Sequence, residues 1–173
     1  MTSLQAVPVG GPDAVRAAFS RYPTGVAVLA AVVGGEPTAV VASSFQVGIS
    51  LDPPLVLFAV AHGSRSWARL AGAPAVGASV LGAGQGALAR QLASKDVGGR
   101  FTGVPVTAAA SGALRIEGGP VWMECTVHDT VTAGDHDVVL LRVRALAQQE
   151  DAAPLVWHAS TFSTTSRTGP AAA

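Results

Sequence analysis

Apolar runs about the length of a β-strand recur along the chain, each bounded by glycine, proline or small polar residues. Runs of this kind that are rich in β-branched residues are typical of buried strands. They predict strands over residues 25–33, 38–42, 55–60, 75–81 and 155–157. Gly34-Gly35 lies between the first two and is a hairpin turn signal, so we expect these two strands to pair antiparallel.

The C-terminal third alternates apolar and polar residues more openly, as expected for strands with one buried face. In residues 121–130 the odd positions as far as Val127 are apolar, including Met123 and Cys125, whereas the even positions are mostly polar. A turn at residues 133–136 then leads into a long strand over 137–146.

Helical signals are short and few. Asp13 can cap a helix over residues 14–20, and two further helices are predicted over 66–70 and 87–93. Residues 94–112 show neither a helical face nor a clean alternation, so we expect a loop there. About seven strands with two or three short helices predict a mainly β fold, a barrel or sandwich with helical insertions.

Length and composition narrow the class of protein. A chain of 173 residues indicates one domain, which we place at residues 13–162, with a flexible arm at 1–12 and a frayed tail at 163–173. A net charge of zero argues against a nucleic-acid or anionic-membrane partner, because both require a basic excess. Charged residues make up only 13%, which suggests that apolar surface meets another subunit.

The chain shows no sign of export or membrane insertion. It has a single cysteine, which excludes an internal disulfide and suits a reducing compartment. The N-terminus lacks a basic stretch followed by a long apolar run, so we expect no signal peptide. No apolar run is long enough for a membrane-spanning helix, and we therefore expect a cytoplasmic protein.

Two turns rich in hydroxyl groups follow the predicted strands 38–42 and 55–60. Ser43 and Ser44 end the first strand, and the segment Ser64–Ser66 follows the second and opens a helix. Hydroxyls and free backbone amides at such positions can bind a phosphate or another polar ligand. The alternative is that Ser64 only caps the helix.

The turn Gly134-Asp135-His136 holds an accessible histidine that could donate to an amide, a ring nitrogen or a phosphate. The alternative is that it only pairs with Asp135 within the turn. We expect no metal site, because the four histidines are scattered and Cys125 and His128 fall on opposite faces of one strand.

A glycine-rich segment at residues 82–87 formally matches the dinucleotide-binding fingerprint G-x-G-x-x-G/A. We reject this interpretation because no acidic residue lies about 20 positions further on. Asp96 comes too early and Glu117 too late. A hydrolase is disfavoured as well, because the chain lacks the G-x-S-x-G nucleophile elbow.

Several short motifs occur in a characteristic order between Phe19 and Phe162. They are Tyr22-Pro23-Thr24-Gly25-Val26, Ser43-Ser44-Phe45, Ser50-Leu51-Asp52-Pro53-Pro54-Leu55, Leu88-Ala89-Arg90, Arg100-Phe101 and Ala133-Gly134-Asp135-His136. In this order they resemble the flavin reductase domain family, small FMN-binding split-barrel reductases that serve two-component flavin monooxygenases. The resemblance implies a Greek-key split β-barrel with a few short helices. It also implies a homodimer that uses FMN or FAD with NADH or NADPH.

The resemblance also implies roles for individual residues. Thr24 and the segment Ala42, Ser43, Ser44 and Phe45 would lie along the flavin ring and ribityl chain. Ser64, Arg65 and Ser66 would hold the phosphate, and Lys95 and Phe101 would close the pocket. His136 would stand beside the nicotinamide nucleotide as hydride passes from its C4 to flavin N5. Reduced flavin would then diffuse to a partner monooxygenase.

Departures from the family pattern keep two alternatives open. Residues 46–49, interpreted as a loop, lack the usual serine or threonine, residues 96–99 carry extra glycine, and the closing strand lacks an expected basic residue. One alternative is a flavin-binding barrel without catalysis. The other is a flavoenzyme that keeps FMN tightly bound and acts on another small molecule.

Overall fold

The computed structural model describes residues 9–165, and the outer parts of the predicted arm and tail lie outside them. Within these residues the chain forms twelve strands and three short helices, which confirms the mainly β prediction. No helix among them is both long and apolar enough to cross a membrane.

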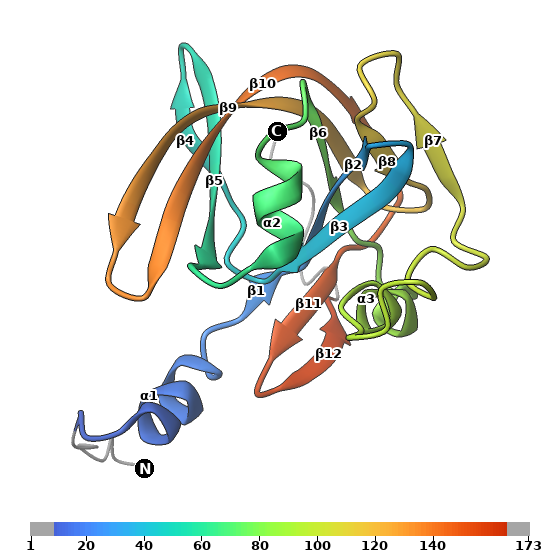
Figure 1. Ribbon diagram of the computed structural model, residues 1–173. Helices are drawn as coiled ribbons and strands as arrows, with labels where there is room; N and C mark the ends of the chain where they lie inside the picture. The colour runs from blue at the N-terminus through green and yellow to red at the C-terminus, as the bar shows by residue number, and fades with distance from the viewer. Residues whose placement is uncertain (1–8, 166–173) are drawn as a thin grey trace.

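The largest sheet has seven strands in the order β3-β2-β6-β9-β10-β5-β4, with every neighbouring pair antiparallel. Its strands are β2 (Ala27–Val33), β3 (Glu36–Ala42), β4 (Gln46–Leu51), β5 (Pro54–Ala61), β6 (Val76–Val80), β9 (Val121–Ala133) and β10 (His136–Gln148). The sheet curls into a barrel, and helix α2 (Arg65–Leu70) lies between β5 and β3 (Figure 1). The two edge strands are not hydrogen-bonded to each other, so the barrel remains split.

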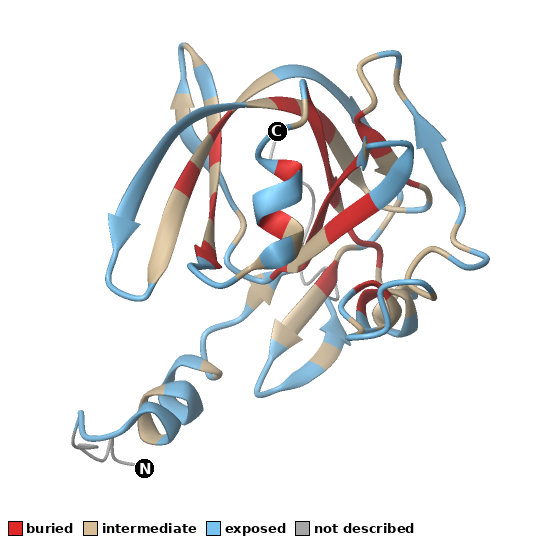
Figure 2. Cartoon of the chain, viewed as in Figure 1, coloured by how far each residue is buried: buried red, intermediate tan, exposed pale blue. Residues whose placement is uncertain are grey.

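The main core fills the barrel beneath α2, where the buried residues gather in Figure 2. Trp67 and Leu70 are the buried residues of α2. The Trp67 ring packs edge-on against Phe58 of β5, with 4.8 Å between the ring centres. Aromatic pairs in this geometry add about 1 kcal/mol to the free energy of area burial. The helix therefore closes the gap between the sheet edges by burying its apolar face.

A second layer lies outside the barrel and is built from smaller elements. These are the sheet β1-β11-β12 (Thr24–Gly25, Leu155–His158, Thr161–Thr164), the hairpin β7-β8 (Val106–Ala108, Leu114–Ile116) and helix α3 (Gly86–Leu92). Leu81, Leu92 and Leu155 are buried together in a core between this layer and the barrel. Leu81 joins the two layers, because its N–H donates to Val26 and its carbonyl accepts from Leu155.

The predicted strand over residues 25–33 is divided between two sheets. β1 pairs with β11, whereas β2 pairs with β3 and β6. The apolar run is continuous across the division, because Val26 and Ala27 are both buried. Hydrophobic periodicity therefore could not locate the break.

Three other predictions are wrong. Residues 46–49 belong to strand β4, which pairs with β5 across a register shift where Gly48 takes a φ of 75°. Residues 94–112 are not all loop, because they include β7. β12 pairs with β11 as far as Thr164, so the frayed tail does not begin at residue 163. Each missed strand is short or exposed, and it forms mainly because it pairs with a neighbouring strand.

Helix α1 (Pro12–Phe19) begins two residues earlier than predicted and is not capped by Asp13. Its N-cap is Gly11, Pro12 occupies its first turn, and Asp13 instead pairs with Arg16 at 3.1 Å. The helix projects away from the barrel and buries no residue (Figures 1 and 2). Phe19 at its end is 74% exposed, so this apolar face has no partner within the described chain.

Candidate functional site

Three adjoining cavities meet at Ser43, where β3 ends. The first is about 270 Å³ and is lined by Val26, Val41, Ser43, Ala89, Arg90, Ala93, Trp157 and Phe162. The second, about 350 Å³, reaches helix α1 through Tyr22, Thr24, Ser43 and Trp157. The third, about 290 Å³, runs from Tyr22 and Thr24 along Ser43 to Gln46. We call the three together the Ser43 groove.

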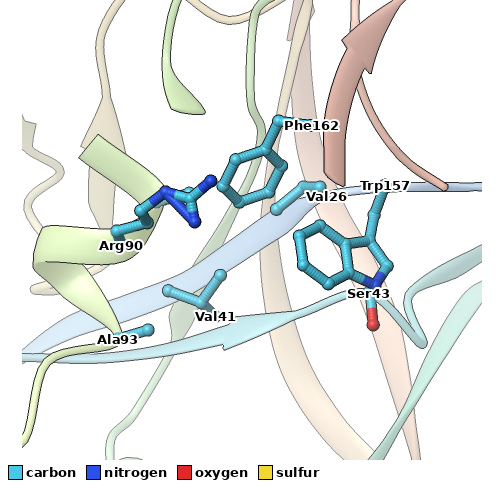
Figure 3. Close-up of a pocket in the computed structure, with 8 residues that line it drawn as sticks. Val26, Val41, Ser43, Arg90, Ala93, Trp157 and Phe162 are labelled. Carbon is cyan, nitrogen blue, oxygen red and sulfur yellow. The ribbon is translucent and has the colours of Figure 1, made fainter. Parts of the chain in front are cut away.

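The first cavity has aromatic walls and one cation (Figure 3). Trp157 and Phe162 meet edge-on at 4.9 Å, and the guanidinium of Arg90 lies 4.8 Å from the centre of the Phe162 ring. These walls suit a flat, largely apolar ring system. No site role was predicted for Trp157 or Phe162, and Arg90 was named only within the Leu88-Ala89-Arg90 motif.

The two serines that follow β3, Ser43 and Ser44, have different roles. Ser44 Oγ both donates to the carbonyl of Ala59 at 2.9 Å and accepts from its N–H at 3.0 Å. Its hydroxyl thus fastens the turn to β5. Ser43 is exposed and its hydroxyl makes no hydrogen bond within residues 9–165. Phe45 packs against the main core, and Ala42 is buried.

Thr24 lines two of the three cavities. Its Oγ1 is buried and has no hydrogen-bond partner within the described residues. An unpaired buried hydroxyl is unfavourable by about 1–3 kcal/mol. A polar edge of a ligand in the groove would have a ready partner there, so the predicted groove residues fit a ring that is apolar on its faces and polar along one edge.

Ser64 caps α2, as the structural alternative predicted, by accepting from the N–H of Trp67 at 3.3 Å. Ser66, two residues further on, has a different partner, because its Oγ accepts from Nη1 of Arg100 at 2.9 Å. Arg65 between them is exposed. The positive charge at this turn therefore comes from the side chains of Arg65 and Arg100. The helix itself adds little, because α2 has only six residues.

Arg100 is a residue that sequence reasoning quoted in a motif but assigned no function. Its Nε donates to Ser94 at 2.7 Å and its Nη1 also reaches the carbonyl of Ala39 at 3.3 Å. It thereby ties the segment after α3 to β3 and to α2. That segment includes the two residues predicted to close the pocket: Lys95 is exposed, and Phe101 packs against the second core.

His136 lies at the tip of the β9–β10 hairpin and is not among the residues that line the Ser43 groove. Its Nδ1 is 2.7 Å from Oδ1 of Asp135, so the pairing foreseen as an alternative does occur. Hydrogen bonding to His136, followed by its charge, lowers the pKa of the Asp135 carboxyl below its usual value. Within residues 9–165 no three His, Cys, Asp or Glu side chains gather so as to hold a metal ion.

The glycine-rich segment at residues 82–87 forms a closed turn. Gln85 accepts from the N–H of Gly82 and donates to the carbonyl of Glu117, both at 2.7 Å. A Cβ at Gly82 would lie 2.5 Å from the carbonyl oxygen of Gly118. The glycine allows close packing against protein here, which agrees with our rejection of a dinucleotide fingerprint.

Comparison with known proteins identifies the class. The model of the flavin reductase like domain matches residues 19–166. A flavin reductase of Pseudomonas putida is 36% identical over 149 residues, which cover 85% of this chain and 86% of that protein. The chain belongs to the flavin reductase like domain family, and the predicted split-barrel fold is confirmed.

Two solved structures are similar throughout. The Streptomyces globisporus NADH:FAD oxidoreductase SgcE6, in complex with NAD and FAD fragments, has a TM-score of 0.88 and 31% identity, covering 96% of this chain and all 100% of that one. BorF, the flavin reductase component of a bacterial two-component tryptophan halogenase, has a TM-score of 0.80 and 31% identity, with coverages of 89% and 98%.

Proposed function

We propose that this protein is an NAD(P)H-dependent flavin reductase that reduces FMN or FAD and supplies reduced flavin, by diffusion, to a partner flavin-dependent monooxygenase. The observation that carries the proposal is the Ser43 groove, because cavities from three parts of the fold meet at one exposed hydroxyl. A groove with this lining suits a flat ring with one polar edge, which is the shape of a flavin.

The groove and the arginine-lined turn divide the flavin between them. Its ring and ribityl chain would lie along Thr24 and residues 42–45, where the hydroxyls of Thr24 and Ser43 are free to bind its polar edge. Its phosphate would lie at residues 64–66, with charge supplied by Arg65 and Arg100. Lys95 and Phe101 stand on the segment that Arg100 ties to this turn, a position suited to closing the site.

The flavin, when bound, accepts a hydride at N5 from C4 of the nicotinamide. The side chains of this protein bind and orient the two partners and need form no covalent bond. His136 is suited to hold the nicotinamide nucleotide, because Asp135 engages its Nδ1 and leaves Nε2 for a ligand. This role for His136 is part of the proposal.

A homodimer in the cytoplasm is the form we propose for the enzyme. Apolar side chains of the edge strand β4 are exposed, with Leu51 at 88%, Val47 at 53% and Ile49 at 40%. An exposed apolar edge strand favours association, and a second copy of the chain would cover it. The neighbouring Phe45 and Gln46 line the groove, so the same association would place the flavin near the interface.

The test is anaerobic mixing of the purified protein with NADH or NADPH and with FMN or FAD. Loss of nicotinamide absorbance is expected with at least one pair, and its absence with all four would overturn the proposal. Titration of flavin separates the alternatives. Saturation with a Michaelis constant supports free flavin as a substrate, whereas flavin that copurifies and remains bound during turnover supports a prosthetic group. A protein that binds flavin yet never oxidises nicotinamide would be a binding barrel.

A further inference from the structure

Two histidines from distant parts of the sequence lie side by side where the β5–β10 ladder ends. His136 begins β10 and is the register partner of Ala61, the residue before His62. The N–H of His62 also donates to the carbonyl oxygen of Asp135 at 3.2 Å. The two histidines thus occupy neighbouring strand ends, and adjacent strands are about 5 Å apart.

Each imidazole is held by its own carboxylate. His62 Nε2 lies 3.1 Å from Oδ1 of Asp137, which also accepts from the Thr132 hydroxyl at 3.1 Å. His136 Nδ1 lies 2.7 Å from Asp135. Because a carboxylate accepts, the engaged nitrogens carry hydrogens. The opposite nitrogens, Nδ1 of His62 and Nε2 of His136, make no hydrogen bond within the described chain.

The His62 side chain is both accessible and restrained. It is 44% exposed, whereas its partner Asp137 is only 28% exposed and is fixed from a second side by Thr132. In sequence His62 precedes Gly63 and Ser64, so it stands between the hairpin tip and the turn proposed to hold the flavin phosphate. A protonated imidazole held in this way can donate its second N–H to a phosphate oxygen.

We propose that His62 binds the pyrophosphate of the nicotinamide nucleotide, with Asp137 as the positioning residue that fixes its ring. The inference rests on the proposed function and adds a second contact to it. In a nicotinamide dinucleotide one ribose separates the nicotinamide from the first phosphate. A donor one strand away from His136 is therefore suited to the phosphates when His136 stands at the nicotinamide.

The test compares two hydride donors at saturating flavin: NADH and 1-benzyl-1,4-dihydronicotinamide, which has no phosphate. For His62→Asn we expect the Michaelis constant for NADH to rise about tenfold, the size of one hydrogen bond to a charged group. The preference for NADH over the phosphate-free donor, as a ratio of kcat/KM values, should fall by the same factor. A structural defect would instead lower kcat/KM equally for both donors and leave this ratio unchanged. That result would overturn the inference.

Variants of Asp137 provide a second, independent test. Asp137→Asn should raise the Michaelis constant for NADH in the same direction, and the double variant His62→Asn/Asp137→Asn should be no worse than His62→Asn alone, because Asp137 acts through His62. Additive effects would show that Asp137 acts separately and would overturn its positioning role.

The matched control is His128→Asn, since His128 is an exposed histidine of the same hairpin at a bulge further along β9. It should leave the donor ratio unchanged, and an equal fall there would count against His62. Activity of the wild-type protein separates the two proposals. If it oxidises neither NADH nor NADPH with either flavin, the proposed function and this inference both fail. If it is active and His62→Asn retains the wild-type ratio, only the inference fails.

Discussion

Arg100 and Ser66 join two segments that are 34 residues apart through a hydrogen bond of 2.9 Å between Nη1 and Oγ. The same guanidinium bonds the carbonyls of Ser94 and Ala39. One side chain therefore connects the first turn of α2, the segment after α3 and the strand that leads to Ser43. If the flavin phosphate lies at residues 64–66, Arg100 both adds a positive charge to its site and holds the surrounding segments in place.

We expect Arg100→Gln to weaken FMN binding more than riboflavin binding, because only FMN carries the phosphate. The Michaelis constant for FMN should rise about tenfold or more, as for loss of a charge-assisted hydrogen bond, and that for riboflavin much less. Steady-state kinetics with both flavins measure this. Arg69→Gln is the control, since Arg69 lies at the other end of α2 and, among residues 9–165, its side chain bonds only the carbonyl of Val33, at 3.3 Å. Equal losses for both flavins would mean that Arg100 acts only through the fold.

The two serines after β3 should separate stability from binding. Ser44→Ala removes both hydrogen bonds to Ala59 and is expected to lower the free energy of unfolding by about 1–2 kcal/mol. Ser43→Ala breaks no hydrogen bond in the described chain and should change it by less than about 0.5 kcal/mol, while raising the Michaelis constant for flavin. Urea unfolding and flavin titration distinguish the two variants. Equal destabilisation would contradict the structural role of Ser44.

At Gly77 the barrel closely approaches its outer layer. A Cβ there would overlap the carbonyl oxygen of Leu114 and the indole nitrogen of Trp122, which are hydrogen-bonded to each other at 3.2 Å. Gly77→Ala should therefore lower the free energy of unfolding by about 2–3 kcal/mol, as overpacking in a core does. Gly84→Ala, where a Cβ would meet nothing within 4 Å, should change it little. A small effect at Gly77 would show that the layers can separate without cost.

The strands that could be predicted have a clear hydrophobic pattern of their own. Strands β2, β3, β5 and β6 followed from apolar runs, and β9 and β10 from the alternating pattern of the C-terminal third. Strand β4 did not, because its side chains are exposed and it forms by pairing with β5. β12 was missed for the same reason. Its residues carry few apolar side chains, and its pairing with β11 depends on a tight turn at Ala159 and Ser160, both at positive φ.

The candidate site was predictable as residue types but not as an arrangement. Ser43, Thr24 and Phe45 were foreseen together, and they do line one cavity. Trp157 and Arg90 were not, because a strand near the C-terminus and helix α3 meet there only after the second layer folds. His62 was dismissed as one of several scattered histidines. Its pairing with Asp137 depends on the β5–β10 register, which no local pattern records.

Cys125 should resist thiol reagents in the folded protein. Burial, followed by the nearby charge of Glu124, raises its pKa from 9.0 to about 12, and only the thiolate is an effective nucleophile. With Ellman's reagent at pH 8 we expect no reaction until urea unfolds the chain. Rapid reaction in native conditions would show that β9 opens locally.

The same shift makes stability depend on alkaline pH. The unfolded thiol ionises above pH 9, whereas the folded thiol stays neutral to about pH 12. The contribution is therefore fully present below pH 9 and is lost as the pH rises towards 12, by about 1.4 kcal/mol per pH unit. Other groups titrate in this range, so the measurement is the difference in free energy of unfolding between wild type and Cys125→Ala. That difference should shrink steadily above pH 9, and a constant difference would mean that Cys125 is accessible to water in the native barrel.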